Sequence, residues 1–419
     1  MTSPVWHPFT QHGLQEPVPT VIRAEGALLH CADGSTLIDA ISSWWVTTHG
    51  HCHPRITAAI AAQAQKLDQV IFAGYTHEPA EEVARGLIAI APSGLSHVFF
   101  SDSGSTSVEV ALKMALGYWH NRKQPRHRIL VLEHSYHGDT IGAMSVGERG
   151  VFNRPYAPLL FDVGTIPFPV EGQEQATLDA LESACRGEQK PAAFIVEPLI
   201  LGAGGMLIYG AGILRAMREI CASHDVLFIA DEVMTGWGRT GTLFACEQAG
   251  ISPDIMCLSK GLTGGSVPLA VTLASTPIFE AHYSTDRAEL FYHSSSYTAN
   301  PIACAAAAAN LAIWREEDVL GRIATLSAAM AARRAGLGND QAFEKSRQIG
   351  AIAAIDMKTA NAGYLSELAP LLRTFFLERG ILLRPLGNTI YVMPPYAITE
   401  DAVDIIFSAI AEAAQAFAP

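Results

Sequence analysis

The chain has 419 residues, of which 49% are hydrophobic and 16% are charged. This composition excludes disordered, collagen-like and coiled-coil proteins, because those classes contain fewer apolar or many more charged residues. Asp and Glu number 41 against 28 Lys and Arg, a net charge of −13, so we expect neither a nucleic-acid partner nor an anionic membrane partner.

The first segment of the chain is predicted to be a short, strand-rich arm. Its opening residues, MTSPVWHPFTQHG, contain neither the basic nor the apolar stretch of a signal peptide. The sequence AEGALLHCADGSTLIDA predicts a β-hairpin that turns at Asp33 and Gly34. The next motif resembles a metal cluster, but alternate positions rarely converge on one ion, so we predict a turn without metal at His49, His51, Cys52 and His53.

From about residue 55 to residue 310, short apolar runs alternate with amphipathic helical stretches. This pattern is typical of a parallel sheet with crossover helices. The predicted strands are His97–Phe100, Ile129–Leu132, Phe194–Val196, Val226–Ala230 and Ile255–Leu258. An uncharged stretch from Pro198 to Leu214 is interrupted by glycines, so it predicts a buried strand end and loop rather than a membrane span.

The Ala-rich segment Ile302–Trp314 predicts a closely packed helix, and the chain beyond it has a mixed pattern with strands near Ile349–Ile355 and Ile390–Met393. The predicted fold class is α/β, with a large domain of mainly parallel sheet flanked by helices and a smaller α+β domain. We predict an N-terminal arm that packs with the small domain (1–50), a large domain (51–312) and a small C-terminal domain (313–419). The 7 cysteines are scattered without a C-x-x-C pair, which argues against disulfides or structural zinc and favours a cytoplasmic protein.

Polar residues follow five of the predicted strands. In open α/β sheets, ligands bind outside the carboxyl ends of the strands. These ends read FFSDSGSTS, LVLEHSYHGDT, FIVEP, LFIADEVMTGWGRTG and MCLSKG. They supply a Gly/Ser loop, an aromatic residue with His and Asp, a Glu, an Asp and a lone Lys, which together predict a cofactor site.

Asp231 and Lys260 end two successive strands. Alone, the first is typical of a turn or helix cap and the second of a surface lysine. Together they suit pyridoxal phosphate, which needs a lysine for covalent attachment and an acidic partner for its pyridine nitrogen. The segment Ser103–Thr106 precedes a helix whose N-terminus suits a phosphate. Tyr136 could lie flat on the cofactor ring or be a half-buried loop residue.

Four motifs, DSGSTSVEVALKMA, YHGDT, DEVMTGWGRTG and LSKGLTGG, resemble the class III (ω-type) aminotransferases of the fold type I pyridoxal phosphate enzymes. They occur in the family's order between residues 102 and 265. The resemblance implies pyridoxal 5′-phosphate as the cofactor, with Lys260 as its covalent partner and the base that moves the proton. It also implies Asp231 at the pyridine nitrogen, Tyr136 stacked on the ring, and Gly104 and Ser105 at the phosphate.

Two further positions follow from the same resemblance. Glu197 matches the Glu of the family's VEP motif. Ser296 falls where the family usually has a Thr that reaches the phosphate of the other subunit, and the hydroxyl is kept. The resemblance therefore implies a homodimer with active sites at the subunit interface.

The terminal segments WHPFT, SSWWVTTHGHCHP and RPLGNTIYVMPPY resemble the 7,8-diaminopelargonate synthase branch of the family, which serves biotin biosynthesis. That resemblance implies amino transfer to 8-amino-7-oxononanoate, with S-adenosylmethionine as the usual donor. Arg384 can bind the carboxylate of this acceptor through paired, charge-assisted hydrogen bonds. Trp44, Trp45 and Tyr391 can line a channel for its methylene groups, and we assign Trp44 rather than Trp45 to the site.

Some positions depart from that branch. Phe9 stands where many of these synthases have a substrate-binding Tyr, Ser294 and Ser295 replace Gly and Pro at the expected donor position, and Leu201 replaces a Gln. These departures leave lysine as an alternative donor. Other ω-aminotransferases of the GABA or diamine type, an aminomutase of the same fold, and an idle cofactor-binding protein are the alternative functions.

Overall fold

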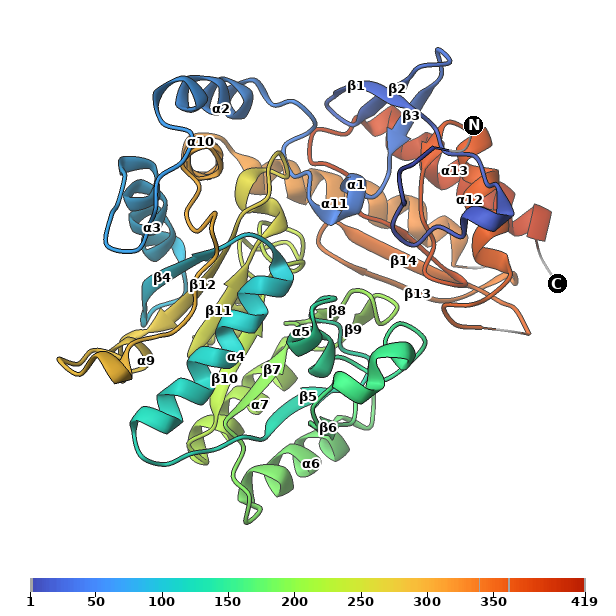
Figure 1. The fold of residues 1–419 in the computed structure, drawn as a ribbon. Helices are drawn as coiled ribbons and strands as arrows, with labels where there is room; N and C mark the ends of the chain where they lie inside the picture. The colour runs from blue at the N-terminus through green and yellow to red at the C-terminus, as the bar shows by residue number, and fades with distance from the viewer. Residues whose placement is uncertain (1–2, 339, 361, 418–419) are drawn as a thin grey trace.

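The computed structural model of the protein describes residues 3–338, 340–360 and 362–417 (Figure 1). Its centre is a seven-stranded sheet with the order β4-β12-β11-β10-β7-β5-β6. The strands β11, β10, β7, β5 and β6 run parallel to one another, and β12 is antiparallel to both β11 and β4. In chain order the strands are β4 (Leu95–Ser101), β5 (Ile129–Leu132), β6 (Gly164–Ile166), β7 (Ala193–Val196), β10 (Leu227–Asp231), β11 (Ile255–Leu258) and β12 (Ala270–Ser275).

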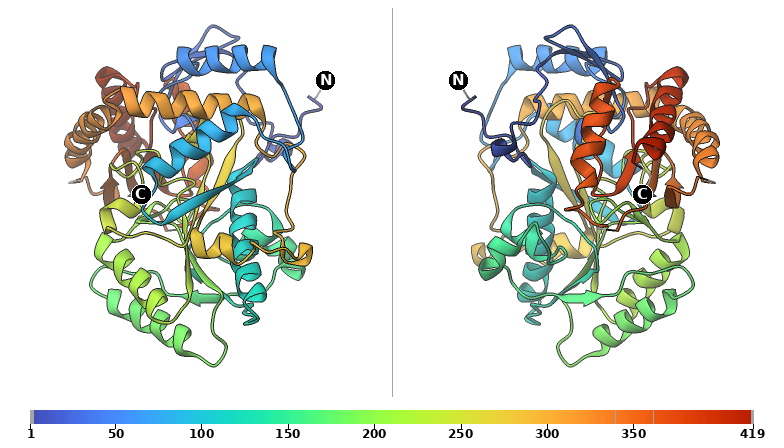
Figure 2. Two further views of the ribbon diagram at one scale, coloured as in Figure 1. Left: turned by 90° about the vertical axis from the view of Figure 1, so that its left-hand side faces the viewer. Right: turned by 90° about the vertical axis from the view of Figure 1, so that its right-hand side faces the viewer.

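The inner strands β5, β7 and β11 are buried along their whole length, which explains why their sequences are uninterrupted apolar runs. Side chains alternate between the two faces of a strand. In β7, Ala193 and Ile195 join the core beneath α4 (Gly104–Asn121), whereas Phe194 and Val196 join the core on the opposite face. That second face is covered by α6 (Glu174–Arg186) and α7 (Ala211–Ser223), as two views of the ribbon show (Figure 2).

All five strands predicted from the apolar runs are present in this sheet, and the predicted α/β class is confirmed. The strands β6 and β12 were not predicted. Their sequences, GTI and AVTLAS, are short or rich in small residues and give a weak strand signal.

The predicted Ala-rich helix is also confirmed. It is α10 (Pro301–Glu316), which packs on α2 (Pro54–Lys66) and α3 (Glu78–Ile90) beside the β4 edge of the sheet. Ala303, Ala306 and Ala307 are buried in α10, so the small side chains allow the close packing that the composition predicted. A further core lies between α11 (Val319–Leu337), α12 (Leu368–Glu378), α13 (Glu400–Phe417) and the antiparallel sheet of β13 (Phe343–Ile349), β14 (Ile352–Met357) and β16 (Thr389–Val392).

The N-terminal strands lie beside this C-terminal part of the chain (Figure 1). The predicted hairpin around Asp33 is present, because β2 pairs antiparallel with β3. Strand β3 also pairs in parallel with β15, with Ile38 opposite Ile381. This four-stranded sheet consists of β1 (Val21–Glu25), β2 (Leu28–Cys31), β3 (Thr36–Asp39) and β15 (Ile381–Leu382). The domain boundaries at residues 50 and 312 stay a prediction.

The strands predicted near Ile349–Ile355 and Ile390–Met393 are present as β14 and β16, but the first begins later than predicted. The chain turns at Gly350 (φ +50°), so that β13 ends at Ile349 and β14 begins at Ile352. Because the apolar pattern continues across the turn, the sequence did not reveal that the chain turns here. A Cβ at Gly350 would lie 2.3 Å from the Gly241 nitrogen, so this turn requires glycine.

The uncharged stretch Pro198–Leu214 forms more regular structure than the predicted strand end and loop. It contains a short antiparallel pair, β8 (Ile200–Leu201) and β9 (Leu207–Ile208), and the first turn of α7. Among the described residues, no helix combines the length and the apolar character needed to cross a membrane.

Candidate active site

The carboxyl ends of the central strands bring the predicted cofactor residues to one cavity. Its volume is about 170 Å³. Asp231 is the last residue of β10, and Lys260 lies two residues after β11, at the start of a short 3-10 helix. Parallel pairing of the two strands, with Asp231 opposite Cys257, fixes their relative position. The cavity lining includes Gly104, Ser105, Tyr136, Glu197, Asp231 and Lys260.

A buried histidine, which the sequence analysis did not single out, holds Asp231. His137 Nδ1 lies 2.6 Å from the Asp231 Oδ2 atom, and both side chains are almost completely excluded from solvent. The Val233 backbone N–H donates to Asp231 Oδ1 at 3.1 Å. The Asp231 carboxylate, which lines the cavity, is therefore held in one orientation. The sequence feature that could have identified His137 as a site residue is its position next to Tyr136 in the YHGDT motif.

The opposite end of the cavity is the N-terminus of α4. Ser103 caps this helix, and its Oγ atom accepts a hydrogen bond from the Thr106 N–H. The Asp139 N–H donates to Ser105 Oγ at 3.2 Å. A Cβ at Gly138 would lie 2.1 Å from that same Oγ, so the two loops approach as closely as glycine permits. The arrangement leaves helix N–H groups and small side chains facing the cavity, which suits a phosphate.

Glu197 fixes the loop that carries Tyr136. Its two carboxylate oxygens accept hydrogen bonds from the backbone N–H groups of Tyr136 (3.0 Å) and Gly202 (2.9 Å). Burial raises the pKa of Glu197 to about 7, although the nearby His137 favours the charged form. Burial also raises the pKa of Tyr136, with the Asp139 charge as a second cause, so its hydroxyl stays protonated at neutral pH.

The electrostatic surroundings of Lys260 favour a reactive amine. Burial lowers the pKa of Lys260 to about 8, while the charges of Asp231 and Glu197 act in the opposite direction. The Lys260 Nζ atom lies 5.1 Å from the centre of the Trp45 ring. The lowered pKa increases the fraction of molecules in which the Lys260 amine is unprotonated near neutral pH, the state in which an amine is nucleophilic.

These residues fit pyridoxal 5′-phosphate. The cavity offers a helix N-terminus for the phosphate, the Asp231–His137 pair for the pyridine nitrogen, Tyr136 for the ring and Lys260 for the aldehyde carbon. The second ring nitrogen, His137 Nε2, is buried and has no hydrogen-bond partner among the described residues. The imidazole therefore interacts with Asp231 alone among the acidic side chains of the described residues, through Nδ1. When bound, the cofactor supplies a ring that accepts electrons from the substrate carbon.

A second cavity of about 350 Å³ adjoins the first, and Trp45, Tyr136 and Lys260 line both. It contains the residues predicted to bind substrate: Phe9, Trp44, Arg384 and Tyr391. The Arg384 guanidinium lies 5.3 Å from the centre of the Trp44 ring and donates to the Phe9 carbonyl at 3.1 Å. Arg384 is therefore the one arginine in a mainly aromatic lining that also contains Lys260 and Asp139.

The assignment of Trp44 rather than Trp45 to the site stays a prediction, and both residues line the substrate cavity. Trp44 is 43% exposed and faces the substrate cavity, whereas Trp45 is 5% exposed and lines both cavities. The Trp45 Nε1–H donates to the Tyr391 hydroxyl at 2.9 Å, so these two residues of the substrate-cavity lining are in direct contact. The sequence SSWW does not show which tryptophan lines which cavity, because their positions depend on an irregular backbone.

The backbone of Ser42, Ser43 and Trp45 has positive φ values of 53°, 60° and 65°. Non-glycine residues rarely adopt this conformation, and it persists only where the surroundings enforce it. Here the enforcing group is Asp39, which is fully buried: its oxygens accept hydrogen bonds from the Ser43 N–H (2.7 and 2.9 Å), and His51 Nε2 lies 2.8 Å away. Asp39 was not predicted from the sequence as a site residue.

Two predicted residues lie outside both cavities. Ser294 is exposed, and the Ser296 carbonyl accepts a hydrogen bond from Gln69 Nε2 at 2.6 Å. Their neighbour Ser295 donates to Asp102 at 2.5 Å, beside the start of α4. The predicted role of Ser296 requires a second subunit and stays a prediction. The histidine motif at His49 forms no metal cluster among the described residues.

Residues 10–414 match the family model described as aminotransferase class-III. The chain belongs to this family and is a pyridoxal-phosphate-dependent transaminase of fold type I. It is 47% identical to the adenosylmethionine-8-amino-7-oxononanoate aminotransferase of Synechococcus elongatus over 416 residues, 97% of each chain. It is 37% identical to the enzyme of the same name from Geobacter sulfurreducens, over 96% of this chain and 93% of the relative.

Solved structures give the same result. The adenosylmethionine-8-amino-7-oxononanoate aminotransferase of Methanocaldococcus jannaschii superposes with a TM-score of 0.93 at 33% identity, over 98% of this chain and 97% of that chain. An amine transaminase of an uncultivated Pseudomonas species, solved with pyridoxal phosphate bound, has a TM-score of 0.93 at 31% identity and full coverage of both chains. The transaminase fold is therefore shared by relatives of different specificity.

Proposed function

We propose that the protein transfers an amino group to 8-amino-7-oxononanoate to form 7,8-diaminononanoate in biotin biosynthesis, with S-adenosylmethionine as the amino donor. The observation that carries this proposal is the cavity between Lys260 and Arg384, whose walls are aromatic. An aliphatic keto acid needs an amine-transfer group at one end, apolar walls, and a cation at the other end. The names of the relatives at 37% to 47% identity support the same substrates.

The proposed roles of the cofactor residues follow from their contacts. Lys260 would hold the cofactor covalently, and its Nζ would move a proton from the donor carbon to the cofactor in the first half-reaction and from the cofactor to the acceptor carbon in the second. Its lowered pKa, about 8, lets the same nitrogen accept and release a proton near neutral pH. Asp231, oriented by His137, keeps the pyridine nitrogen protonated. Gly104 and Ser105 bind the phosphate, and Tyr136 packs against the ring.

The proposed roles at the substrate end rest on shape and charge. Arg384 binds the acceptor carboxylate in two parallel hydrogen bonds. Trp44, Tyr391 and Phe9 border the methylene chain and exclude water from it. Because Phe9 has no hydroxyl, it contributes only apolar contact. We propose Ser294 as a donor contact that forms across the subunit interface.

We propose a homodimer in which the partner subunit's Ser296 reaches the phosphate. Support comes from exposed apolar side chains on two loops, since large exposed apolar groups mark protein interfaces. These side chains are Ile71, Tyr75, Tyr292 and Tyr297, each more than 60% exposed. We also propose a cytoplasmic location, which the free state of all 7 cysteines supports.

A donor scan tests the function. The absorbance spectrum of the cofactor-loaded enzyme is followed as S-adenosylmethionine, lysine, GABA or alanine is added without acceptor, and 8-amino-7-oxononanoate is then added. A spectral change with S-adenosylmethionine that the oxononanoate reverses is the expected result. A change with lysine alone would replace the donor and keep the acceptor. A response only to GABA or alanine, without reversal, would make the enzyme another ω-aminotransferase.

A further inference from the structure

The backbone of Lys260 adopts a conformation that is rare for a lysine. Its φ angle is +47°, in the left-handed region that favours glycine, and it opens the 3-10 helix Lys260–Thr263. A residue with a side chain keeps such a conformation only where its surroundings hold it. We call residues 260–265 the lysine turn. It packs against Trp237, because a Cβ at Gly261 would lie 2.7 Å from the Trp237 Cβ. The position of the Lys260 amine therefore depends on the contacts of this turn.

Asn310, a residue of the Ala-rich helix α10, holds the lysine turn. It is completely buried, and its Nδ2 atom donates to the carbonyls of Gly261 and Leu262, both at 3.0 Å. These are the two residues that directly follow Lys260. Asparagine is a poorer helix former than the alanines around it. Its presence in α10 is explained by the two carbonyls that it binds.

His49 fixes the orientation of the Asn310 amide. Its Nε2 atom lies 2.8 Å from the Asn310 Oδ1 atom. Because the Asn310 NH₂ group faces two carbonyls, its oxygen faces the imidazole, which must donate through Nε2–H. Burial lowers the pKa of His49 to about 3, so the ring is neutral near neutral pH and carries its one proton on Nε2. The amide of Asn310 therefore has a single favourable orientation.

The lysine turn is also in contact with the N-terminal segment that contains Trp44. The Thr48 N–H donates to the Gly264 carbonyl at 3.3 Å. A Cβ at Gly265 would lie 2.5 Å from the Val46 carbonyl carbon. The turn and this segment are therefore packed directly against each other, and the His49–Asn310 hydrogen bond links them a second time.

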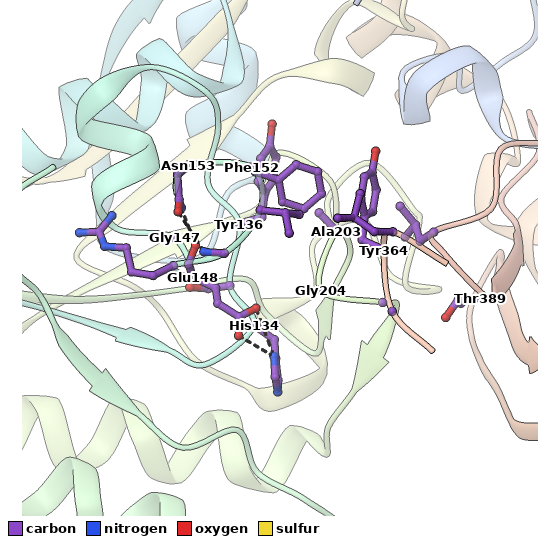
Figure 3. Close-up of a pocket in the computed structure, with 18 of the residues that line it drawn as sticks. His134, Tyr136, Gly147, Glu148, Phe152, Asn153, Ala203, Gly204, Tyr364 and Thr389 are labelled. Atoms are coloured by element: carbon purple, nitrogen blue, oxygen red, sulfur yellow. Dashed lines mark hydrogen bonds and ion pairs between the residues drawn. The ribbon is translucent and has the colours of Figure 1, made fainter. Parts of the chain in front are cut away.

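Neither Asn310 nor His49 lines a cavity of the active site. Both are absent from the linings of the cofactor cavity and the substrate cavity. Both are also absent from the lining of a third cavity, of about 650 Å³, which adjoins the substrate cavity at Phe152 and Tyr364 (Figure 3). An effect of either residue on the reaction must therefore pass through the lysine turn.

We propose that Asn310 is a positioning residue for Lys260 and that His49 holds Asn310 in the orientation this role requires. The reacting atom of Lys260 is Nζ, at the end of a flexible side chain that is anchored by its backbone. By binding two carbonyls of the lysine turn, Asn310 fixes that anchor and the place from which Nζ acts. This role is the same for any amino donor and acceptor, so it does not depend on the substrates proposed above.

Cofactor attachment to the cofactor-free chain provides the first test. Asn310→Ala suits the helix but leaves two buried carbonyls without their donor, so the turn should loosen and Lys260 should become more hydrated. The attachment rate should fall by about tenfold or more. Its pH midpoint should rise from about 8 toward the ordinary lysine value, since burial is the main cause that lowers it. The charges that act on Lys260 are those of Asp231, Glu197 and Arg239, and this substitution leaves them in place.

Further variants separate positioning from stability. His49→Gln keeps an N–H donor for the Asn310 oxygen and should attach the cofactor almost as the wild type does, whereas His49→Ala should resemble Asn310→Ala. Asn121→Ala is the matched control. Asn121, in α4, also donates from Nδ2 to two loop carbonyls, those of Ala281 and Glu289 (both 3.0 Å), and lies outside the three cavity linings. It should lower the melting temperature without moving the pH midpoint.

Turnover of the loaded enzyme provides the second test, with the substrates that the donor scan identifies. In Asn310→Ala, kcat per attached cofactor should fall by about 10- to 100-fold while KM changes by less than about threefold, because no substrate contact is removed. A lower melting temperature with an unchanged pH midpoint and kcat would overturn the inference and leave Asn310 a structural residue. An equal shift of the midpoint in Asn121→Ala would also overturn it. If Asn310→Ala does not fold, the pair His49→Ala and His49→Gln gives the same measurements.

Discussion

The cofactor end of the active site is built from strand ends, whereas the substrate end is built from segments that are far apart in the sequence. Asp231 and Lys260 follow neighbouring parallel strands whose register sets their separation. Phe9, Trp44 and Arg384 instead come from the N-terminal arm, an irregular turn and the C-terminal part of the chain. The first group is positioned by the core of the sheet, and the second by individual hydrogen bonds.

We infer from this difference that the cofactor end determines the reaction and that the substrate end determines which substrates bind. The Asp231–His137 pair and Glu197 are buried in the same core that stabilises the sheet. Trp44 and Arg384 are only partly buried and are held by a strained turn and one carbonyl contact. We infer that relatives with this fold can exchange the substrate end and keep the cofactor end, which agrees with the high TM-scores of transaminases of other specificity.

The largest effect is expected at Lys260. Lys260→Ala removes both the covalent attachment of the cofactor and the base, so turnover should fall by about 10⁴-fold or more. The absorbance band of the lysine-bound cofactor should disappear at the same time, while the melting temperature changes little. Full activity in this variant, measured with excess cofactor, would contradict the assignment of Lys260 as the covalent partner of the cofactor and as the base.

A smaller and more selective loss is expected at Arg384. Arg384→Gln removes a charge-assisted pair of hydrogen bonds to the carboxylate, which should lower kcat/KM for 8-amino-7-oxononanoate by about 10- to 100-fold. The loss should appear mainly in KM, because the contact is the same before and during the reaction. Arg149→Gln serves as the comparison, because Arg149 lies outside the lining of the substrate cavity and donates to the carbonyls of Met144 (3.1 Å) and Phe161 (2.6 Å). An acceptor KM unchanged by Arg384→Gln would place the carboxylate elsewhere.

The cofactor end was largely predictable from the sequence because its signal is local. Each apolar run ends in one polar residue of the site, and parallel strands bring such ends to one edge of the sheet. This reasoning located Asp231, Lys260, Tyr136, Gly104 and Ser105, which the structure brings to one cavity. It did not extend to His137, whose bond to Asp231 joins the ends of two strands that are not neighbours in the sheet.

The substrate end was only partly predictable, because its geometry depends on contacts between distant segments. Trp44 lines the substrate cavity and Trp45 lines both cavities, and this division follows from positive φ angles that no sequence pattern shows. Phe152 and Tyr364 also line the substrate cavity, and their ring centres lie 4.3 Å apart although the residues come from separate parts of the chain. Nothing in either local sequence indicates this contact. The hairpin at Gly350 was missed for a related reason, since the apolar pattern continues through its turn.

Asp39 tests whether the strained turn sets specificity. Asp39→Asn keeps the shape but loses a charged acceptor, so the free energy of unfolding should fall by about 1–3 kcal/mol. The acceptor KM should rise by roughly 3- to 10-fold as Trp44 and Trp45 become less ordered, with a smaller change in kcat. Asp33→Asn, at an exposed turn, is the control. Equal changes in KM and kcat would instead indicate a purely structural role.

The smallest expected effect is a pH shift in the attachment of the cofactor to Lys260. Only the unprotonated amine attacks the aldehyde, so in the cofactor-free chain the attachment rate should rise with pH and reach half its maximum near the Lys260 pKa of about 8. The Glu197 charge favours the ammonium form, so Glu197→Gln should move this profile to lower pH by less than about one unit. Because the Glu197 pKa is about 7, the wild-type carboxyl is increasingly neutral below that pH, and the two profiles should converge there.

The rate is read from the absorbance of the lysine-bound cofactor, with the exposed Glu171→Gln as the control. A shift to higher pH would contradict the proposed electrostatic link between Glu197 and Lys260.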